Sequence, residues 1–320
     1  MNFVSNYFLG VDGGQSGTTL LIGDETGRVL GCGKSGPCNH AGTEQGREKF
    51  TRAVMESLHQ ACAQAGLDPS RTHFRAACFG LSGGPRGKRP ILEKLLSVGK
   101  LILVEDFVTA LAGATAGQPG IITIAGTGSV AFGRNCRGTT AHAGGWGYLF
   151  GDEGGAFDLV RQALRGTLRF EEGWGPPTTL LPRMLEASSA ASANELMHRF
   201  YTAEFPRHKI AAFAPLVDEE AQQGDIVARV ILENAARQLA ELTAAVHGQL
   251  FQEGEAVCVA YLGGVFRSRL LLEHFRMLIE MHKGCRCGPP TYGPATGALI
   301  EAYRAEGLAP EIQGQPQHEK

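Results

Sequence analysis

A strand–turn–strand unit with glycine in the turn occurs twice in this chain, and it limits the possible folds more than any other feature. The segment "YFLGVDGGQSGTTLLIGDETGRVLGCG" predicts an antiparallel meander with strands at 7–13, 18–23 and 28–33. The segment "GIITIAGTGSVAFGRN" (120–135) repeats the order strand, glycine turn, strand. Such a weak internal repeat predicts two related halves. The length of 320 residues agrees with this, because domains of about 150 residues are usual.

The rest of the chain alternates between patterns of buried strands and patterns of amphipathic helices. This alternation predicts an α/β chain with a break between its domains near 107–119. Further strands are expected at 74–84, where the strand runs into a glycine loop, and at 100–106 and 256–264. Helices are expected at 44–65, 107–116, 154–170, 178–187, 193–201, 211–223, 225–250, 267–282 and 294–306.

The composition argues against several classes of protein. A formal net charge of −2 indicates neither a nucleic-acid partner nor a membrane-surface partner. The first residues lack the pattern of a signal peptide, and the longest apolar runs are too short to span a bilayer. Eight scattered cysteines favour free thiols in a reducing compartment, so we expect a cytoplasmic protein. The "CRC" stretch (285–287) is not expected to bind metal, and the basic run "GPRGKRP" (84–90) is expected to be a solvated loop.

Three glycine turns share one chemistry. They are "DGGQSGT" (12–18), "GTGS" (126–129) and "GGVFRS" (263–268). Small residues allow backbone N–H groups to approach an anion closely, so the first two turns are candidates to bind the phosphates of one nucleotide. The chain has no GxxxxGK[ST] motif, and no GxGxxG between a strand and a helix, which argues against a P-loop and a Rossmann site. Hydroxyl donors are expected from Ser16, Thr18, Thr127 and Ser129.

These turns, with Asp12 at the end of the first strand, resemble the actin-like ATPase superfamily of sugar kinases, actin and heat-shock chaperones. Within it, the chain is similar to the family of N-acetylglucosamine kinases and BadF/BadG-type ATPases, and the resemblance runs from residue 9 to about 268. It is carried by "GVDGGQSGTTLLI", "CNHAGTE", "GLSGG", "VEDFVTAL", "TIAGTGSVAFG", "AQQGD", "YLGGVFRS" and, most specifically, "GGWGYLFGDEGGAFDL".

The resemblance implies two ribonuclease-H-like domains that flank a nucleotide and sugar cleft. The first would span 1–115, with the C-terminal helix at 294–310 as a candidate to complete it, and the second would span 116–293 with a helical insertion. The implied cofactors are ATP and Mg²⁺, and Asp12 would hold the magnesium directly or through water. The implied nucleotide-binding residues are Asp12, Gly13, Gly14, Gln15, Ser16 and Thr18, then Gly126, Thr127, Gly128 and Ser129, and finally Gly263 and Gly264 under the adenosine.

Asp106 is the expected general base, because phosphoryl transfer needs a carboxylate that accepts the proton of the attacking hydroxyl. Its neighbour Glu105 has the same chemistry, but alternation along "LVED" directs the two side chains to opposite faces. The resemblance favours Asp106. The alternative role for Asp106 is a cap for the helix at 107–116.

The resemblance also implies a set of sugar-binding residues. Two of them have alternative roles: His40 as a hydrogen-bonded structural residue, and Asp152 as a cap of the helix that starts near Gly154. Ala143 stands where some relatives carry a cysteine, which affects fine specificity only. The implied set is Asn39, His40, Ser82, Gly83, Gly145, Trp146, Asp152 and Glu153.

The resulting expectation is an ATP-dependent kinase that phosphorylates the 6-hydroxyl of an amino sugar, foremost N-acetylglucosamine. Glucosamine or N-acetylmuramic acid is the alternative substrate. Two other classes stay open at this point: an ATPase that activates a partner redox enzyme, and an ATP-binding regulatory module without catalysis. By analogy with the family, a homodimer is expected.

Overall fold

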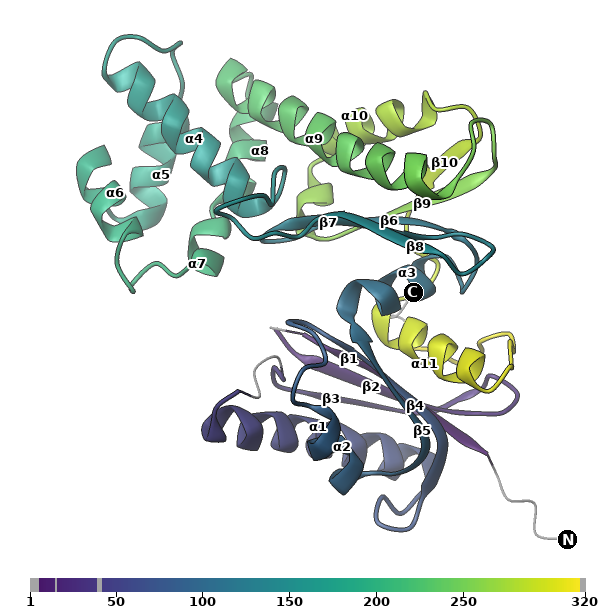
Figure 1. Ribbon diagram of the computed structural model, residues 1–320. Helices are drawn as coiled ribbons and strands as arrows, with labels where there is room; N and C mark the ends of the chain where they lie inside the picture. Colours follow the sequence, from purple (N-terminus) through teal and green to yellow (C-terminus); the bar gives the residue numbers. More distant parts are fainter. Residues whose placement is uncertain (1–5, 15, 39–41, 317–320) are drawn as a thin grey trace, which may run out of the picture. The chain divides into compact units, whose positions relative to one another are not determined.

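The computed structural model describes residues 6–14, 16–38 and 42–316 (Figure 1). The chain divides into two compact units. Unit 1 comprises the chain up to Gln118 together with the chain from Pro290 onward, and unit 2 comprises Pro119–Pro289. Within the described ranges, no helix has the length and apolar character needed to cross a membrane.

Unit 1 is built on a five-stranded mixed sheet with the strand order β3-β2-β1-β4-β5. The first three strands form the predicted antiparallel meander, and β4 and β5 add to it in parallel on the other side of β1. The carboxyl ends of β1, β4 and β5 therefore lie at one edge of the sheet. The strands are β1 (Tyr7–Gly13), β2 (Thr18–Asp24), β3 (Val29–Ser35), β4 (His73–Leu81) and β5 (Ser97–Glu105).

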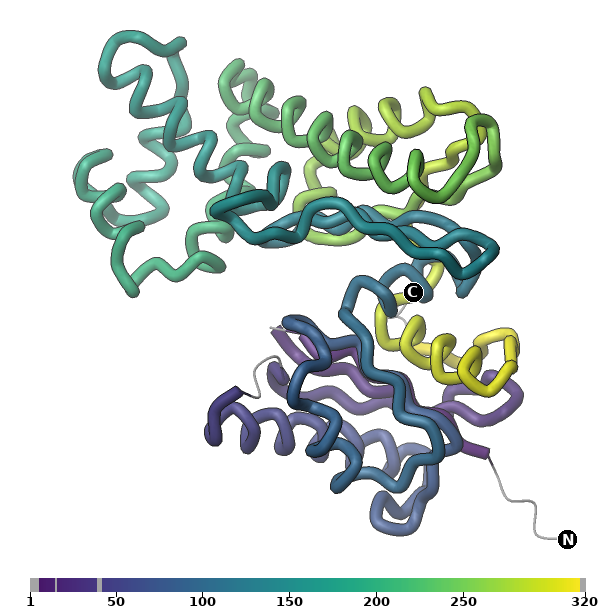
Figure 2. Tube along the Cα trace, in the orientation of Figure 1, coloured from purple at the N-terminus to yellow at the C-terminus, as the bar shows by residue number. Residues whose placement is uncertain are grey.

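Both faces of this sheet are covered by helices, so its strands alternate between two apolar cores. Leu9 and Val11 belong to the core under α1, whereas Phe8 belongs to the core under α11. Figure 2 shows the C-terminal helix, in yellow, against the strands formed by the start of the chain. The helices of unit 1 are α1 (Glu44–Ala65), α2 (Arg89–Leu95), α3 (Asp106–Ala114) and α11 (Pro294–Ala305).

Unit 2 repeats the topology of unit 1. Its sheet has the order β8-β7-β6-β9-β10, with an antiparallel meander from β6 to β8 and parallel pairing of β6 with β9 and of β9 with β10. This correspondence confirms the α/β class and the two related halves predicted from the repeated turn. The strands are β6 (Gly120–Ala125), β7 (Ser129–Arg134), β8 (Thr140–Gly144), β9 (Val257–Leu262) and β10 (Cys285–Gly288).

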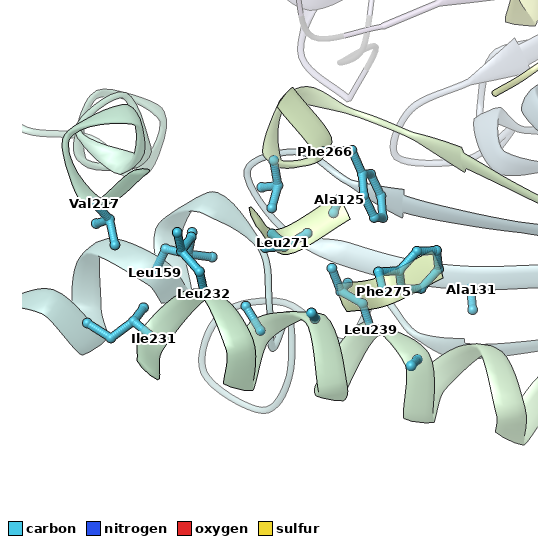
Figure 3. Close-up of a cluster of buried hydrophobic side chains, with 14 of the residues drawn as sticks. Ala125, Ala131, Leu159, Val217, Ile231, Leu232, Leu239, Phe266, Leu271 and Phe275 are labelled. Atoms are coloured by element: carbon cyan, nitrogen blue, oxygen red, sulfur yellow. The ribbon is translucent and has the colours of Figure 1, made fainter. Parts of the chain in front are cut away.

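A helical segment separates β8 from β9. Its last member, α9, packs on β6, β7 and β8, in the position that α1 takes in unit 1. Figure 3 shows how Leu159 of α4, Leu232 of α9 and Phe275 of α10 join one core with residues of the sheet. The helices are α4 (Ala156–Glu171), α5 (Leu180–Ser188), α6 (Ala193–Phe200), α7 (Arg207–Ala211), α8 (Ala214–Gln222), α9 (Ile226–Leu250), the 3₁₀ turn η1 (Gly264–Arg267) and α10 (Arg269–Glu280).

Four short elements, β8, β10, α2 and α7, were not predicted. Each has four to seven residues, too few for a periodic pattern to separate strand or helix from loop. The "CRC" stretch forms β10, where Cys287 is buried and burial raises the pKa of its thiol to about 12.

Candidate functional site

The first glycine turn joins β1 to β2, and Asp12 lies at the end of β1 next to Gly13. The turn is closed by the N–H of Gly14, which donates to the carbonyl of Gly17 at 2.9 Å. A Cβ on Gly13 would lie 2.5 Å from Sγ of Cys38, so a side chain at this position would collide with the segment that follows β3. A residue larger than glycine at this position would therefore require the Cys38 and Leu81 side chains to shift.

The structure brings Ser82 and Asp106 together at the same edge of the unit 1 sheet. The Ser82 hydroxyl donates a short hydrogen bond to Oδ2 of Asp106, and the Phe107 N–H donates to Oδ1 at 2.9 Å. Asp106 is the first residue of α3 and Glu105 is its N-cap, but it is the Asp106 carboxylate that accepts from a first-turn N–H, so the capping role considered as its alternative is met in part. A carboxylate has about four lone-pair positions, which leaves Asp106 able to accept a further proton or hydrogen bond.

The basic run at 84–90 is not simply a solvated loop, because Lys88 is only 2% exposed. Its Nζ donates to the carbonyls of Ser82 and Gly84, at 3.2 and 2.9 Å. Burial lowers the pKa of Lys88, and the nearby Cys38 and Asp106 act in the opposite direction. The prediction was wrong because a local charge run does not reveal that its central cation turns inward to brace the loop after β4.

Other predicted residues of unit 1 have different positions. Gln15, Asn39 and His40 lie outside the described residues, while Ser16 and Gly83 are exposed. Thr18 is buried and its hydroxyl donates to the carbonyl of Gly36 at 2.8 Å. The expectation that this hydroxyl faces a phosphate is not met, since it holds the base of the turn instead.

The second glycine turn joins β6 to β7 and is fastened to the start of α4. The N–H groups of Ala156 and Phe157 donate to the carbonyls of Gly126 and Thr127, at 2.8 and 3.1 Å. The Ser129 hydroxyl donates to the Glu153 carbonyl at 2.6 Å, so it also serves the protein rather than a ligand. The turn and the loop before α4 therefore form one hydrogen-bonded piece.

Asp152 is buried, and it bridges this turn to an arginine that the sequence did not indicate. Its Oδ1 accepts a long bond of 3.4 Å from the Ser129 N–H, and its Oδ2 forms a short ion pair with Nη2 of Arg207. The N-cap of α4 is Gly155 and has no side-chain hydrogen bond, so Asp152 does not cap this helix. Asp152 has a φ of 64°, a left-handed conformation that aspartate tolerates better than most residues.

The "GGWG" loop leads from β8 towards Asp152. Gly144, Gly145 and Gly147 have φ values of 81°, 77° and 83°, a region that favours glycine. Trp146 is 72% exposed, so its ring is available to stack on a ligand. Glu153 is half-buried, and no hydrogen bond to its carboxylate is found within the described part of the chain. Of the two adjacent acids, Glu153 is therefore the more accessible acceptor.

The second and third glycine turns line one cavity of about 510 Å³ within unit 2. Gly263 has a φ of 114°, and a Cβ there would lie 2.3 Å from the Ala125 carbonyl, so the two turns touch through their backbones. This volume falls within the range of small-molecule sites. Sequence reasoning did not find the opposite wall, which comes from the helical segment. The lining residues are Gly126, Thr127, Ala156, Leu159, His208, Ala211, Ala212, Ala214, Pro215, Asp218, Leu232, Gly264, Val265, Arg267 and Ser268.

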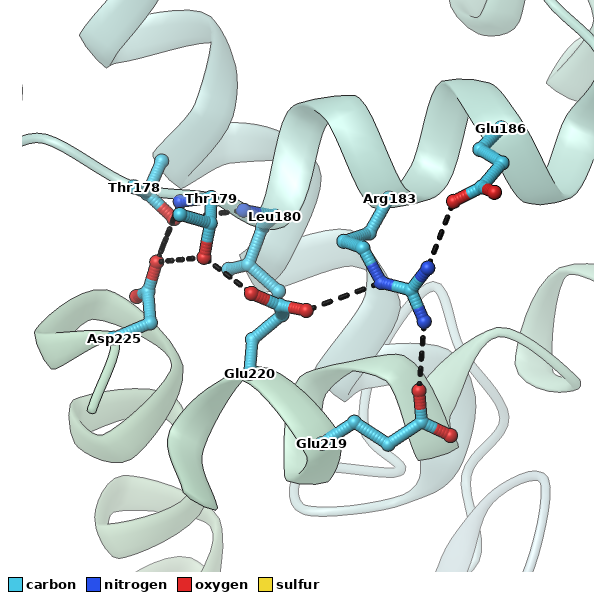
Figure 4. A network of polar contacts seen from close by, with 8 residues as sticks. All are labelled: Thr178, Thr179, Leu180, Arg183, Glu186, Glu219, Glu220 and Asp225. Atoms are coloured by element: carbon cyan, nitrogen blue, oxygen red, sulfur yellow. Dashed lines mark hydrogen bonds and ion pairs between the residues drawn. The ribbon is translucent and has the colours of Figure 1, made fainter. Parts of the chain in front are cut away.

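A polar network holds the helices that form this wall (Figure 4). Glu220 of α8 is 2% exposed and accepts from Arg183 and from the Thr179 hydroxyl. Asp225 accepts from the Thr178 hydroxyl and the Thr179 N–H, both at 2.7 Å, and from the Ala228 N–H at 2.9 Å. Burial alone would raise the pKa of Asp225, but these hydrogen bonds outweigh it and lower the pKa.

The position and chemistry of Asp12 fit a magnesium ion. It offers a hard carboxylate oxygen at the end of β1, which suits Mg²⁺. Mg²⁺ usually takes one or two protein carboxylates and completes its shell with phosphate and water oxygens. One carboxylate beside a turn that is expected to bind phosphate is consistent with that preference.

Comparison with known proteins agrees with this arrangement. Residues 9–302 match the model of the BadF/BadG/BcrA/BcrD ATPase family. An N-acetylmuramic acid/N-acetylglucosamine kinase of Clostridium acetobutylicum is 31% identical over 86% of this chain and 91% of its own length. An N-acetyl-D-glucosamine kinase of Dictyostelium discoideum is 28% identical over 93% of this chain and 98% of its own.

The solved structure of a proposed N-acetylglucosamine kinase from Chromobacterium violaceum is also similar. It has a TM-score of 0.74 and 28% identity, covering 92% of this chain and 98% of that one. The similarity spans both units and agrees with the expected two-domain actin-like fold. With the family match over most of its length, this chain belongs to the BadF/BadG/BcrA/BcrD ATPase family.

Proposed function

We propose that this protein is an ATP-dependent kinase that phosphorylates the 6-hydroxyl of an amino sugar, foremost N-acetylglucosamine. The observation that carries the proposal is the cavity of unit 2, which is lined by Gly126, Thr127 and Gly264 from two turns expected to bind nucleotide. The relatives named N-acetylglucosamine kinase and N-acetylmuramic acid/N-acetylglucosamine kinase support the class of substrate. In this proposal the two units are the two ribonuclease-H-like domains, and the helices α4 to α8 are the helical insertion.

The cavity suits an adenosine. Leu159, Pro215 and Val265 supply apolar surface for a base, and Asp218 supplies a carboxylate that could accept from ribose hydroxyls. The phosphates would then lie along the backbone of 126–129, where small residues allow close approach. The first glycine turn, with Gly13 and Gly14, is assigned to the nucleotide by the family resemblance alone.

Asp106 is proposed to act as the general base. As the sugar oxygen attacks the γ-phosphorus, Asp106 would take the hydroxyl proton, the bond from the γ-phosphorus to the bridging oxygen would break, and ADP would leave. Ser82 would orient the carboxylate through Oδ2 and leave lone pairs for the sugar. Asp12 would hold Mg²⁺, which supplies charge neutralisation for the phosphates when bound.

The sugar is proposed to stack on Trp146 and to donate hydroxyl hydrogen bonds to Glu153, the accessible acid of the pair. Gly145 would let the backbone pass close to the ring. Asn39, His40 and Gly83 are assigned to the sugar by the family resemblance alone. We also propose a homodimer on the same ground, and a cytoplasmic location because eight scattered cysteines favour a reducing compartment.

The test is a coupled assay of the purified protein with Mg-ATP and a panel of N-acetylglucosamine, glucosamine, N-acetylmuramic acid and glucose. The expected result is turnover on N-acetylglucosamine, with the 6-phosphate identified by NMR. Phosphate at another position would overturn the assignment of the hydroxyl. ATP binding without turnover on any amino sugar would overturn the kinase assignment and favour an ATPase that acts on a protein partner.

A further inference from the structure

We propose that Arg207 is a positioning residue for the second glycine turn. It neutralises the Asp152 carboxylate, which would otherwise repel the phosphates of the nucleotide. The inference depends on one part of the proposed function, namely that the turn at 126–129 binds phosphate. Arg207 comes from α7, a five-residue helix that the sequence did not predict.

The Arg207 side chain is held on two sides. Its Nη2 pairs with Oδ2 of Asp152, and its guanidinium lies 5.3 Å from the ring centroid of Tyr148 and 5.8 Å from that of Phe157. The two rings contact each other edge to face at 5.1 Å. Cation–π contacts of this kind add to the ion pair and fix the position of the guanidinium.

The pair is packed directly against the backbone of the turn. A Cβ on Gly128 would lie 2.3 Å from Oδ2 of Asp152 and 2.7 Å from Nη2 of Arg207. Asp152 also accepts from the N–H of Ser129, the last residue of the turn. A buried carboxylate therefore touches the stretch of backbone proposed to receive phosphate oxygens.

An uncompensated negative charge at this place would oppose the binding of a polyphosphate. Asp152 is only 5% exposed, so water screens its charge poorly. The positive charge of Arg207 cancels it at contact distance and keeps the carboxylate directed at the Ser129 N–H. The arginine thus acts on the nucleotide through Asp152, without having to touch the nucleotide itself.

The experiment measures the dissociation constant of Mg-ATP in the absence of sugar for the full chain and three variants. For Arg207→Gln we expect affinity to fall about tenfold, since one partner of a buried pair is left charged. For Arg207→Lys, which keeps the charge, we expect a change of about threefold or less. For Arg207→Gln combined with Asp152→Asn, we expect affinity to return to within about threefold of wild type, because no charge is then uncompensated.

The matched control is Arg199→Gln, which removes an arginine–glutamate ion pair from α6 of the same helical segment, at a position that does not line the cavity, and should leave the affinity for ATP unchanged. Thermal unfolding of every variant reports loss of structure. Unchanged affinity in Arg207→Gln would overturn the proposal, and so would a double variant as weak as the single one. ATP binding is measured without sugar, so failure of the kinase assignment alone would leave this result intact.

Discussion

The first and second glycine turns, at 12–18 and 126–129, occupy the same place in two sheets of the same topology, yet their surroundings differ. In unit 1 the nearby carboxylate, Asp106, accepts from a hydroxyl and a backbone N–H, and the buried cation Lys88 binds carbonyls. In unit 2 the nearby carboxylate, Asp152, is paired directly with the cation Arg207.

Because of this difference, Asp106 is suited to proton transfer, whereas Asp152 is suited to holding the second turn in position. Asp106 has neutral hydrogen-bond partners and spare lone pairs, so it can take a proton from a substrate hydroxyl. Asp152 is buried and committed to a guanidinium and to the turn. The repeated topology thus carries two carboxylates with different tasks, and each task follows from the partners that tertiary contacts supply.

The largest expected effect is that of Asp106→Asn on turnover. We expect kcat to fall by about 100-fold or more, because the amide cannot accept the proton, while the dissociation constant of ATP changes by about twofold or less. Steady-state kinetics and an ATP titration measure both. Glu105→Gln is the neighbouring control and should keep near-normal kcat. A near-normal kcat in Asp106→Asn would place the general base elsewhere.

The next comparison lies within the second turn. Gly128→Ala should destabilise the protein by about 1–3 kcal/mol, because the added Cβ meets an ion pair that is held in place. Gly126→Ala should change stability by about 0.5 kcal/mol or less, since a Cβ added there would meet no atom of the described residues within 4 Å, apart from its chain neighbours. Urea unfolding measures both variants. Equal stabilities would contradict the close packing of Asp152 against Gly128.

Removing the buried cation of unit 1 should have a smaller effect. Lys88→Met leaves the Ser82 and Gly84 carbonyls without their donor, which is unfavourable, but it also removes the cost of burying a charge. The free energy of unfolding is therefore expected to fall by only about 1 kcal/mol. Urea unfolding measures this loss. Arg86→Met, at an exposed position of the same run, is the control. An equally stable Lys88→Met protein with unchanged kcat would show that Lys88 does not brace the loop.

The smallest expected effect is a pH dependence of stability that arises from Asp225, in the polar network that supports the cavity wall. The native pKa of Asp225 is lowered from its ordinary value of 3.8, so its stabilising contribution is complete above pH 3.8 and is lost as pH falls through the native pKa. Asp225→Asn should therefore be less stable than wild type at pH 7, and the difference should shrink below pH 3.8. Unfolding curves at several pH values test this. A difference that stays constant with pH would rule out the charge as its cause.

Much of the fold and some of the site could be predicted from the sequence. Short segments with strong local patterns predicted three features correctly. These are the glycine turns, the meander of β1 to β3, and Asp106 directly after a strand. Local patterns did not predict three other features. These are the burial of Lys88, the hydrogen bonds of the Thr18 and Ser129 hydroxyls to backbone carbonyls, and the cavity wall formed by α7 and α8.

By itself, the sequence indicated where the backbone comes close to other groups, because glycine is the residue that suits the φ of 114° and the close backbone contact found at Gly263. It also determined the two related sheets, because the alternation of apolar and polar residues and the turn residues are local signals that depend only on nearby positions in the chain. Only the tertiary structure decided which charges meet. Asp152 and Arg207 are 55 positions apart, and their contact depends on how the helical segment packs, which no local pattern encodes.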